Sequence, residues 1–562
     1  MPHTMRHSRL ALATLAILAL TPIAATAQDT SAPHLEKRGA VTQLIVDGNP
    51  FVMLGGELHN SSSSSLEYMK PLWPRLAALP LNTVLTPISW ELVEPTEGHY
   101  DFALIDGLIS QAREQHVRIV FLWLAAWKNG VSSYPPVWVK QNTERFPHAI
   151  LNGSLSTTLS TLASVSTALR EADAKAFTAV MHHIKEADNR DHTVIMMQVE
   201  NEVGTLTDTR DHSADANRAF ASAVPSELPK YLKAHRETLN PELRELWLAH
   251  GEKTSGTWAE IFGDSSRADE IFMAWNYAHY VQAVTAAGKA AYNLPMYVNT
   301  WLGGGDGTPG SYPSGGPQPR VIDIWKSAGT ALDFYAPDLY QPNFAEWANQ
   351  YHRPDNPLFM PETNGGTAGA AWVFYAVGEH AALGFCPFAI DAAFAPDAAH
   401  TTEPSLVDFI KGTTDLGNSY TAINAIAPIL LEQQAKGNVH GFNLTKQHPN
   451  VEFTMNNYSV QISLDQIFGY QSDTGYGLVM MTGNEEKTGQ AEFLGVGKGF
   501  RVIITSRTPG KHIGFATIDD GKYEDGKWIP ARRLNGDETD QGGAWRFDPR
   551  AIHTEKATLY RY

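Results

Sequence analysis

Eight short, almost continuously apolar runs, separated by helix-like stretches, constrain the fold of this 562-residue chain more than any other feature. The runs lie at residues 51–56, 83–88, 118–124, 193–199, 294–299, 332–337, 357–361 and 383–389. Helix-like stretches such as Leu66–Ala78, Asp106–Gln115 and Asp173–Ala187 lie between them. Strands that are apolar on both faces are typical of a parallel sheet covered by helices. The pattern therefore predicts an α/β fold, a (β/α)8 TIM barrel over residues 38–400.

The chain is too long for a single hydrophobic core, and the pattern of apolar and polar residues changes after the barrel. Residues 401–438 are predicted to form a helical connector. Residues 439–562 carry short alternating runs separated by turn dipeptides, which predicts a C-terminal all-β sandwich domain. About 90 residues separate the fourth and fifth apolar runs, with a predicted helix near Ala268–Tyr292, and insertions of this kind usually line or roof a site.

The N-terminus has the pattern of a secretory signal peptide over residues 1–27. Arg6 and Arg9 precede the apolar stretch Leu10–Leu20, and Ala25-Thr26-Ala27 forms a small-residue cleavage site. We expect a secreted protein, periplasmic in a Gram-negative host, with no membrane segment after cleavage. The net charge of −17 becomes more negative once this basic segment is removed, which argues against nucleic acid or anionic membranes as partners.

Motifs for metals and cofactors are missing from the sequence. No histidines have the spacing of a zinc helix, and no GxGxxG, Walker or GxSxG motif occurs in its required context. The single cysteine, Cys386, lies in an apolar run and is predicted to be a small buried hydrophobic residue. We therefore expect no cofactor, no metal and no internal disulfide.

Two glutamate motifs carry the chemistry. Gln198-Val199-Glu200-Asn201-Glu202 closes the fourth apolar run, and Pro361-Glu362-Thr363-Asn364 closes the seventh. Every strand of a β/α barrel ends on the same face, so these glutamates are expected to meet there. Two carboxyl groups facing each other across a sugar perform glycoside hydrolysis.

The predicted roles follow from that chemistry. Glu202 is the candidate general acid and base, and Asn201 beside it is expected to hold a substrate hydroxyl. Glu362 is the candidate nucleophile that forms a glycosyl-enzyme. Taken singly, Glu202 could instead belong to a surface turn and Glu362 could cap a helix, but the pair is more specific than either motif alone.

With these motifs in place, the sequence resembles glycoside hydrolase family 35, the β-galactosidases, over about 350 residues. The supporting motifs are Gly55-Gly56-Glu57-Leu58-His59, Trp90-Glu91-Leu92-Val93-Glu94-Pro95 with Gly98, Tyr100, Asp101 and Phe102, and Pro135-Pro136 with Trp138. The resemblance implies a retaining exo-β-galactosidase of a divergent, exported bacterial branch that acts on plant-cell-wall-type oligosaccharides. Glu57 is carried over as a sugar-contacting residue.

The sequence departs from the family pattern at three positions. Glu91 and Val93 stand where the family has asparagine and histidine, and Ala126 stands where many members have a galactose-contacting glutamate. Glu91 is the candidate replacement for that missing carboxylate. The resemblance therefore implies the mechanism, while these departures leave the choice of sugar open.

Several aromatic residues fall at or just past predicted strand ends, where sugar rings can stack on them. Trp301 and Tyr340 are the stronger candidates for substrate contact, followed by Trp127 and Trp123. Asn299, two residues before Trp301, is a further candidate for bonding a hydroxyl. The alternative is that the aromatic rings only pack the barrel rim.

Two rival functions stay open at this stage. One is the same mechanism on another glycone, such as a β-glucoside or an α-L-arabinopyranoside, and Ala126 motivates it. The other is a glycan-binding protein without catalysis. The C-terminal domain either packs on the barrel or binds polysaccharide, and neither the natural glycan (xyloglucan or pectic galactan fragments are candidates) nor the oligomeric state follows from the sequence.

Overall fold

The computed structural model describes residues 32–151, 160–303, 307–394, 404–467, 470–483, 490–524 and 526–562. The predicted signal peptide, residues 1–27, lies outside these ranges. Among the described residues, no helix combines the length and the apolar character needed to cross a membrane.

Eight parallel strands close into a barrel, as the sequence predicted, in the order β10-β11-β4-β5-β6-β7-β8-β9. They are β4 (Met53–Glu57), β5 (Thr83–Ser89), β6 (Arg118–Lys128), β7 (Val194–Asn201), β8 (Met296–Trp301), β9 (Phe334–Leu339), β10 (Met360–Thr363) and β11 (Gly384–Pro387). All eight residues of β7 are buried, which explains why the strand sequences are apolar without alternation.

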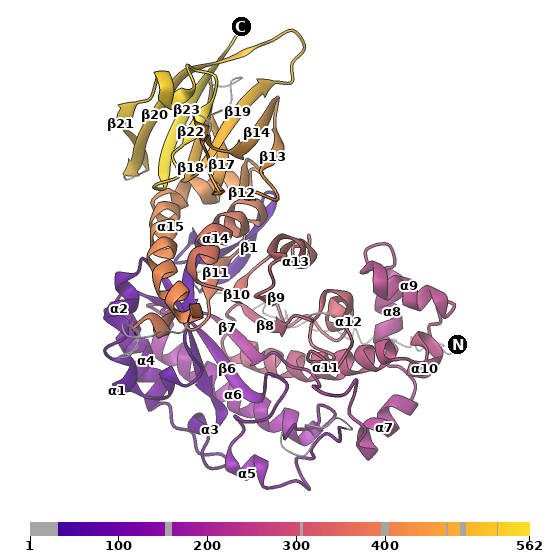
Figure 1. Ribbon diagram of the computed structural model, residues 1–562. Coiled ribbons are helices and arrows are strands. Elements are labelled where there is room, and N and C mark those ends of the chain that lie inside the picture. The colour runs from indigo at the N-terminus through magenta and orange to yellow at the C-terminus, as the bar shows by residue number, and fades with distance from the viewer. Residues whose placement is uncertain are drawn as a thin grey trace, which may run out of the picture.

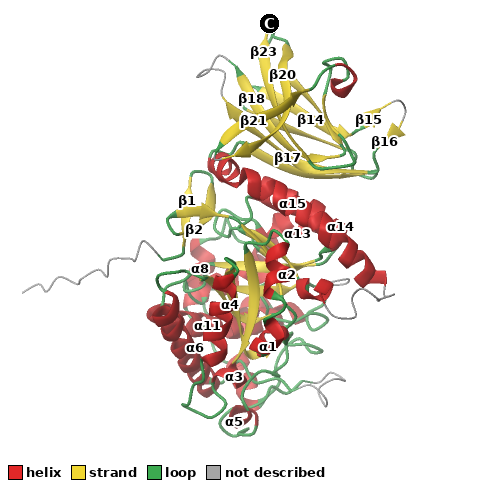
Figure 2. Cartoon of the chain, turned by 90° about the vertical axis from the view of Figure 1, so that its left-hand side faces the viewer, coloured by secondary structure: helices red, strands yellow, loops and turns green. Residues whose placement is uncertain are grey.

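The first predicted run, residues 51–56, is divided between two sheets. Its beginning belongs to β3 (Asn49–Phe51), which pairs with β2 (Val41–Val46) in an N-terminal antiparallel sheet completed by β1 (His34–Arg38). The barrel strand β4 begins two residues after β3 ends. The N-terminal sheet lies beside the C-terminal part of the chain (Figure 2). The backbone N–H of Ala40 donates a hydrogen bond to the carbonyl of Ala435 at 3.1 Å.

Helices cover the outside of the barrel (Figure 1). They are α1 (Leu66–Met69), α2 (Trp73–Ala78), α3 (Trp90–Val93), α4 (Ala103–Glu114), α5 (Val137–Lys140), α6 (Thr167–Asp188), α11 (Ser266–Ala291), α12 (Ile322–Ser327), α13 (Phe344–Tyr351) and α14 (Gly366–His380). The long helices begin at side-chain caps: Ser166 accepts from the N–H of Leu169 before α6, and Ser265 accepts from that of Ala268 before α11.

The insertion between β7 and β8 contains four short helices besides α11. They are α7 (Ala214–Ala221), α8 (Glu227–Ala234), α9 (Pro241–Ala249) and α10 (Trp258–Phe262). They form a lobe to one side of the barrel (Figure 1). Their apolar repeats span only one or two turns each, so sequence periodicity identified α11 but not these four.

The long helix α15 (Pro404–Ala435) leads to the C-terminal β sheets. One sheet has six strands, β12 (Val439–Thr445), β17 (Thr474–Gly483), β18 (Ala491–Lys498), β23 (His553–Arg561), β20 (Ile513–Glu524) and β21 (Lys527–Arg533), and the other has four, β13 (Asn450–Met455), β14 (Tyr458–Leu464), β19 (Phe500–Ser506) and β22 (Trp545–Phe547). A hairpin of β15 (Gln466–Ile467) and β16 (Tyr470–Gln471) adds a two-stranded sheet. A separate hydrophobic cluster that includes Phe442, Val460, Phe493 and Phe500 joins the two larger sheets.

The C-terminal sheets pack directly on the barrel through α14. A Cβ atom added to Gly441 in β12 would lie 2.2 Å from the carbonyl oxygen of Phe374, and one added to Gly378 would lie 2.6 Å from the Cα of Gly441. Backbone therefore touches backbone at this boundary, which leaves no room for a larger side chain at either glycine.

Candidate active site

Polar side chains from five of the eight barrel strands converge at the carboxyl ends of those strands. They are Glu57 (β4), Lys128 (β6), Asn201 and the following Glu202 (β7), Asp338 (β9) and Glu362 (β10). Each is at most 7% exposed. Five ionisable groups buried together are costly unless they share charge and protons, and such clusters mark functional sites.

The two predicted catalytic glutamates lie next to each other. One carboxylate oxygen each from Glu202, Asp338 and Glu362 lies within 4.8 Å of the other two. Asp338 and Glu362 are direct register partners in the neighbouring strands β9 and β10. The barrel topology thus brings together two motifs that are about 160 residues apart in the sequence.

Glu202 is held by hydrogen bonds to its main chain and its side chain. Its backbone N–H donates to Oδ1 of Asn299 at 2.9 Å, and Asn129 Nδ2 donates to its Oε2 at 2.5 Å. Its φ angle of 45° lies in the left-handed region, which non-glycine residues rarely adopt. This backbone conformation costs free energy and persists because the surrounding contacts fix it.

Glu362 has one bonded and one free carboxylate oxygen. The Tyr340 hydroxyl donates to Oε1 at 2.7 Å. Oε2 is buried and has no hydrogen-bond partner among the described residues. A buried carboxylate oxygen without a partner is unfavourable and is available to a ligand or an electrophile.

Burial and charge give the two glutamates different proton affinities. Burial and, after it, the negative charge of Glu362 raise the pKa of Glu202 to about 7, although Lys128 and a hydrogen bond with Asp338 act in the opposite direction. Burial also raises the pKa of Glu362, but the Lys128 ammonium and the Tyr340 hydroxyl both lower it. The arrangement favours a protonated Glu202 beside an ionised Glu362, which is the division of roles between acid and nucleophile.

Asp338 and Lys128 are site residues that the sequence analysis missed. Asn299 Nδ2 donates to Asp338 Oδ2 at 2.7 Å, and Asp338 also shares a hydrogen bond with Glu202. Burial, followed by the charge of Glu362, raises the pKa of Asp338 well above its usual range. Both residues are polar groups at the ends of otherwise apolar strands, and this signal could have identified them.

The predicted hydroxyl-binding residues Asn201 and Glu57 have unused polar atoms at the site. Lys128 Nζ donates to Asn201 Oδ1 at 2.9 Å, while Asn201 Nδ2 has no partner among the described residues. Both carboxyl oxygens of Glu57 are also buried without one. Burial raises the pKa of Glu57 well above its usual range, and the charge of Glu362 raises it further. These atoms suit a ligand rich in hydroxyl groups.

The remaining residues that the sequence predicted to contact substrate differ in how exposed their side chains are. Trp301 and Tyr340 are 38% and 37% exposed, so their rings remain available. The Asn299 side chain accepts a hydrogen bond from the Glu202 backbone N–H and donates one to Asp338, and therefore positions these two groups.

The structure contradicts the prediction that Trp127 contacts substrate. It is wholly buried, its indole N–H donates to the Leu162 carbonyl at 3.0 Å, and its ring packs edge-on against Tyr277 and Tyr280. Trp123 is equally buried. Strand β6 continues to Lys128, four residues beyond the predicted end, so both tryptophans lie within the packed strand and pack the barrel wall.

Glu91 lies on the helix α3, which begins directly after the carboxyl end of β5. Its carboxylate forms an ion pair with Lys140 at 3.3 Å, and both side chains are partly exposed. Its backbone N–H donates to the carbonyl of Tyr134. Burial raises the pKa of the Tyr134 hydroxyl, Lys128 lowers it, and the negative charge of Glu91 raises it.

Glu200, two positions before Glu202, accepts hydrogen bonds from the backbone of β6. Its two oxygens accept the N–H groups of Ala126 and Trp127, each at 2.9 Å. Its carboxyl group is also hydrogen-bonded to that of Asp173, and burial raises both pKa values. Ala126 is therefore held in place through its backbone.

The three clustered carboxylates are also the residues that could hold a cation. Within the described part of the chain, Glu202, Asp338 and Glu362 form the one group close enough for shared coordination, and oxygen donors of this kind suit Mg²⁺ or Ca²⁺. Tyr340 and Asn129 already donate to two of these carboxylates, and burial raises all three pKa values. Shared protons are thus a second way to balance the charge of this cluster.

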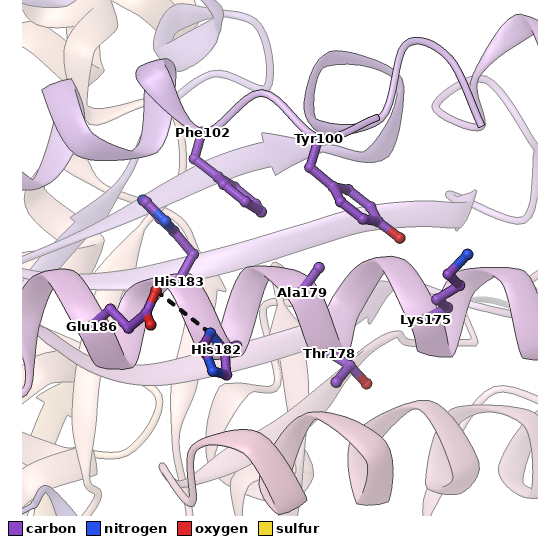
Figure 3. A pocket seen from close by; sticks show the side chains of 8 residues that line it. All are labelled: Tyr100, Phe102, Lys175, Thr178, Ala179, His182, His183 and Glu186. Carbon is purple, nitrogen blue, oxygen red and sulfur yellow. Dashed lines mark ion pairs between the residues drawn. The ribbon is translucent and has the colours of Figure 1, made fainter. Parts of the chain in front are cut away.

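A separate hollow of about 550 Å³ lies on the outer face of α6 and shares no residue with this site (Figure 3). Phe102 stacks on the His183 ring, with centroids 4.2 Å apart, and His183 Nε2 contacts Asp106 at 2.7 Å. His182 points outward and pairs with Glu186. Both histidines of the hollow are therefore paired with carboxylates at the outside of the barrel.

Two family models match parts of the chain. A model described as Beta-galactosidase (Glyco_hydro_42) matches residues 75–267, and a Domain of unknown function (DUF5597) matches residues 416–546. The β-galactosidase from Xanthomonas manihotis is 30% identical over 217 residues, which cover 36% of this chain and 32% of that protein. The chain thus matches about a third of its relative's length.

Solved structures with a similar arrangement include two glycosidases. The β-galactosidase from Rahnella sp. R3 has 16% identity and a TM-score of 0.43, covering 67% of this chain and 57% of that one. The exo-β-1,4-mannosidase from Opitutaceae bacterium strain TAV5 has 14% identity and a TM-score of 0.39, covering 71% and 63%.

The family model and the sequence relative together support a glycoside hydrolase of the β-galactosidase type. They do not support family 35 specifically, because the matching model is that of another β-galactosidase family.

Proposed function

We propose that this protein is an exported, retaining exo-β-galactosidase that removes terminal β-D-galactose from plant-cell-wall-type oligosaccharides. The observation that carries the proposal is the buried pair of Glu202 and Glu362, with carboxylate oxygens within 4.8 Å and different proton affinities. Retaining glycosidases place their two carboxyl groups about 5–5.5 Å apart, whereas inverting enzymes need about 6.5–9.5 Å. The short spacing favours retention.

In the first step, Glu362 Oε2 attacks the anomeric carbon of galactose. The bond from that carbon to the glycosidic oxygen breaks, and Glu202 transfers its proton to the departing oxygen. The products are a galactosyl ester of Glu362, an ionised Glu202 and the released alcohol. Oε2 suits this role because Tyr340 occupies only Oε1.

In the second step, water attacks the anomeric carbon as Glu202 accepts its proton. The ester bond breaks, galactose leaves with its configuration retained, and both carboxyl groups return to their first state. The switch of Glu202 from acid to base follows from electrostatics. Esterification removes the negative charge of Glu362, one cause of the raised Glu202 pKa, so Glu202 then ionises more readily.

The galactose ring would lie between the unpartnered polar atoms and the exposed aromatic rings. Asn201 Nδ2 and the Glu57 carboxyl are free to bond hydroxyls, and Trp301 offers an exposed ring face. We also propose that the protein is related to glycoside hydrolase family 35, on the basis of the sequence motifs around Glu57 and Glu91.

A different glycone is the second candidate, and Ala126 favours it. A methyl group replaces a carboxylate that would bond sugar hydroxyls, so a β-glucoside or an α-L-arabinopyranoside could fit as well. The proposed export to the periplasm is based on the signal-peptide pattern of residues 1–27 alone.

Release of nitrophenol from 4-nitrophenyl β-D-galactopyranoside tests the proposal. The mature protein should be active and Glu362→Gln should lose at least about a thousandfold in kcat while keeping its fold. Glu186→Gln, an exposed glutamate on α6, is the matched control and should behave like the wild type. Faster release from the glucoside or arabinopyranoside would move the assignment to that glycone, and sugar binding without turnover of any glycoside would indicate a non-catalytic protein.

A further inference from the structure

A groove of about 670 Å³ lies between the barrel and the C-terminal sheets. We call it the interdomain groove. It is lined by the segment 342–346 at the start of α13, by Trp372, Tyr375 and Glu379 on α14, and by residues of β12 and β13. These four elements lie beside one another in Figure 1.

The barrel wall of the groove is an aromatic platform. Trp372 and Tyr375 are partly exposed, and Trp372 stacks on the buried ring of Phe344 with centroids 4.5 Å apart and planes 16° apart. Tyr375 stands edge-on to Trp372 at 5.7 Å. The buried ring beneath Trp372 fixes the plane that it presents, and a fixed aromatic plane is suited to the apolar face of a sugar ring.

The opposite wall combines another ring with groups that bond hydroxyls. Phe453 on β13 is partly exposed and stacks on His440 at 4.1 Å, and His440 in turn contacts Glu379 at 2.9 Å. The amide side chains of Asn443 and Asn450 also line the groove. Flat apolar surfaces bordered by amide and carboxylate groups match the alternating C–H faces and hydroxyls of an oligosaccharide.

The groove is preformed. Its lining includes Gly441, where an added Cβ atom would lie 2.2 Å from the carbonyl oxygen of Phe374 on α14. Because these backbones touch, the two walls cannot slide without disrupting the boundary. A rigid groove binds an extended ligand without the cost of ordering its own walls.

One end of the groove lies close to the catalytic site. Tyr340, whose hydroxyl contacts Glu362, precedes the groove residue Asn343 by only three positions. Three residues span at most about 10 Å between Cα atoms. A chain of sugars that leaves the site past Tyr340 could therefore reach the groove within two or three units.

We propose that the interdomain groove binds the part of an oligosaccharide that extends beyond the galactose to be cleaved. This proposal rests on the proposed function and names the substrate class more closely: a chain of several neutral sugars, held by both the barrel and the C-terminal sheets. The C-terminal part of the protein would then contribute to substrate selection through β12 and β13.

Two measurements on the full mature chain test the proposal. The first is affinity electrophoresis of Glu362→Gln in gels that contain galactosylated xyloglucan. The second compares kcat/KM for a galactosylated xyloglucan oligosaccharide with that for 4-nitrophenyl β-D-galactopyranoside. Trp372→Ala alters one wall of the groove, and Phe453→Ala alters the other if the first variant fails to fold. Tyr68→Ala, an exposed aromatic on α1, is the matched control.

We expect each groove variant to weaken retardation and to lower kcat/KM for the oligosaccharide by roughly three- to tenfold, the effect of one aromatic contact. Activity on the nitrophenyl galactoside should stay within about twofold of the wild type, and Tyr68→Ala should change neither value. Equal retardation of all variants, or none of the parent, would overturn the groove proposal even if the galactoside is hydrolysed. Retardation that depends on Trp372 without galactoside hydrolysis would keep the groove and reject the galactosidase.

Discussion

Tyr340 donates its hydroxyl hydrogen to Oε1 of Glu362 at 2.7 Å, while Oε2 has no hydrogen-bond partner in the described part of the chain. This relationship orients the carboxylate, since the hydrogen bond fixes one of its two oxygens. It also lowers the proton affinity of Glu362 in a site where burial raises it. Tyr340 is thus expected to control both the geometry and the charge of the nucleophile.

Tyr340→Phe should keep the fold and lower kcat/KM by about 10- to 100-fold, the value of one hydrogen bond to a charged group. The pKa of Glu362 should rise, so the acidic limb of the pH profile should move to higher pH. Tyr68→Phe, an exposed tyrosine, is the control. Lower activity with an unmoved acidic limb would show that Tyr340 contacts substrate without acting on Glu362.

Lys128→Met should move both limbs of the pH profile upward. The Lys128 ammonium lowers the pKa values of Glu202 and Glu362, so its removal raises both. Wild-type kcat/KM should fall as pH rises through about 7, where Glu202 loses the proton it donates. Lys140→Met removes a partly exposed ammonium and should leave the profile unchanged. A basic limb that stays in place in Lys128→Met would contradict this electrostatic account.

Glu202→Gln should stabilise the protein at alkaline pH while removing its activity on galactosides with poor leaving groups. The folded pKa of Glu202 is raised to about 7, so folding takes up a proton above the unfolded pKa. The stability that depends on this proton is complete at low pH and is lost as pH rises through about 7. The free energy of unfolding that is lost in this way, relative to low pH, is on the order of 3 kcal/mol at pH 8.

Thermal unfolding of Glu202→Gln and wild type at pH 5 and pH 8 measures this effect. The Tm of the variant should exceed that of the wild type at pH 8, and the gap should shrink toward pH 5. A gap of the same size at both pH values would mean that ionisation of Glu202 is not its cause. Glu186→Gln again serves as the exposed control.

Asn299→Ala should destabilise the chain by about 1–3 kcal/mol, because the Glu202 backbone N–H and Asp338 each lose a buried hydrogen bond. The left-handed Glu202 should then relax, and kcat should fall more than KM rises. The thermal midpoint and steady-state kinetics on the nitrophenyl galactoside provide both readouts. A pure increase in KM would instead assign Asn299 to substrate binding, as the sequence suggested.

The barrel and the meeting of Glu202 and Glu362 at its mouth could be predicted from the sequence for a physical reason. Strands buried on both faces must be apolar, and a glutamate that ends such a run, as Glu202 and Glu362 do, stands out. Lys128 and Asp338 end their strands in the same way but lack a motif, so only the three-dimensional structure drew attention to them.

Other features depend on contacts that a single sequence does not display. The burial of Trp127 follows from the unexpected length of β6, and the division of residues 51–56 between two sheets follows from the pairing of β3 with β2. The four short helices between β7 and β8 are stabilised by packing more than by their own periodicity.

Trapping with 2,4-dinitrophenyl 2-deoxy-2-fluoro-β-D-galactopyranoside tests the central claim most directly. The fluorine slows hydrolysis of the glycosyl-enzyme more than its formation, so a retaining enzyme accumulates the ester. We predict stoichiometric release of dinitrophenol and a peptide that carries one fluorogalactosyl group on Glu362. A label on another residue, or turnover of the galactoside with inversion and no trapped ester, would contradict the assignment of Glu362 as the nucleophile.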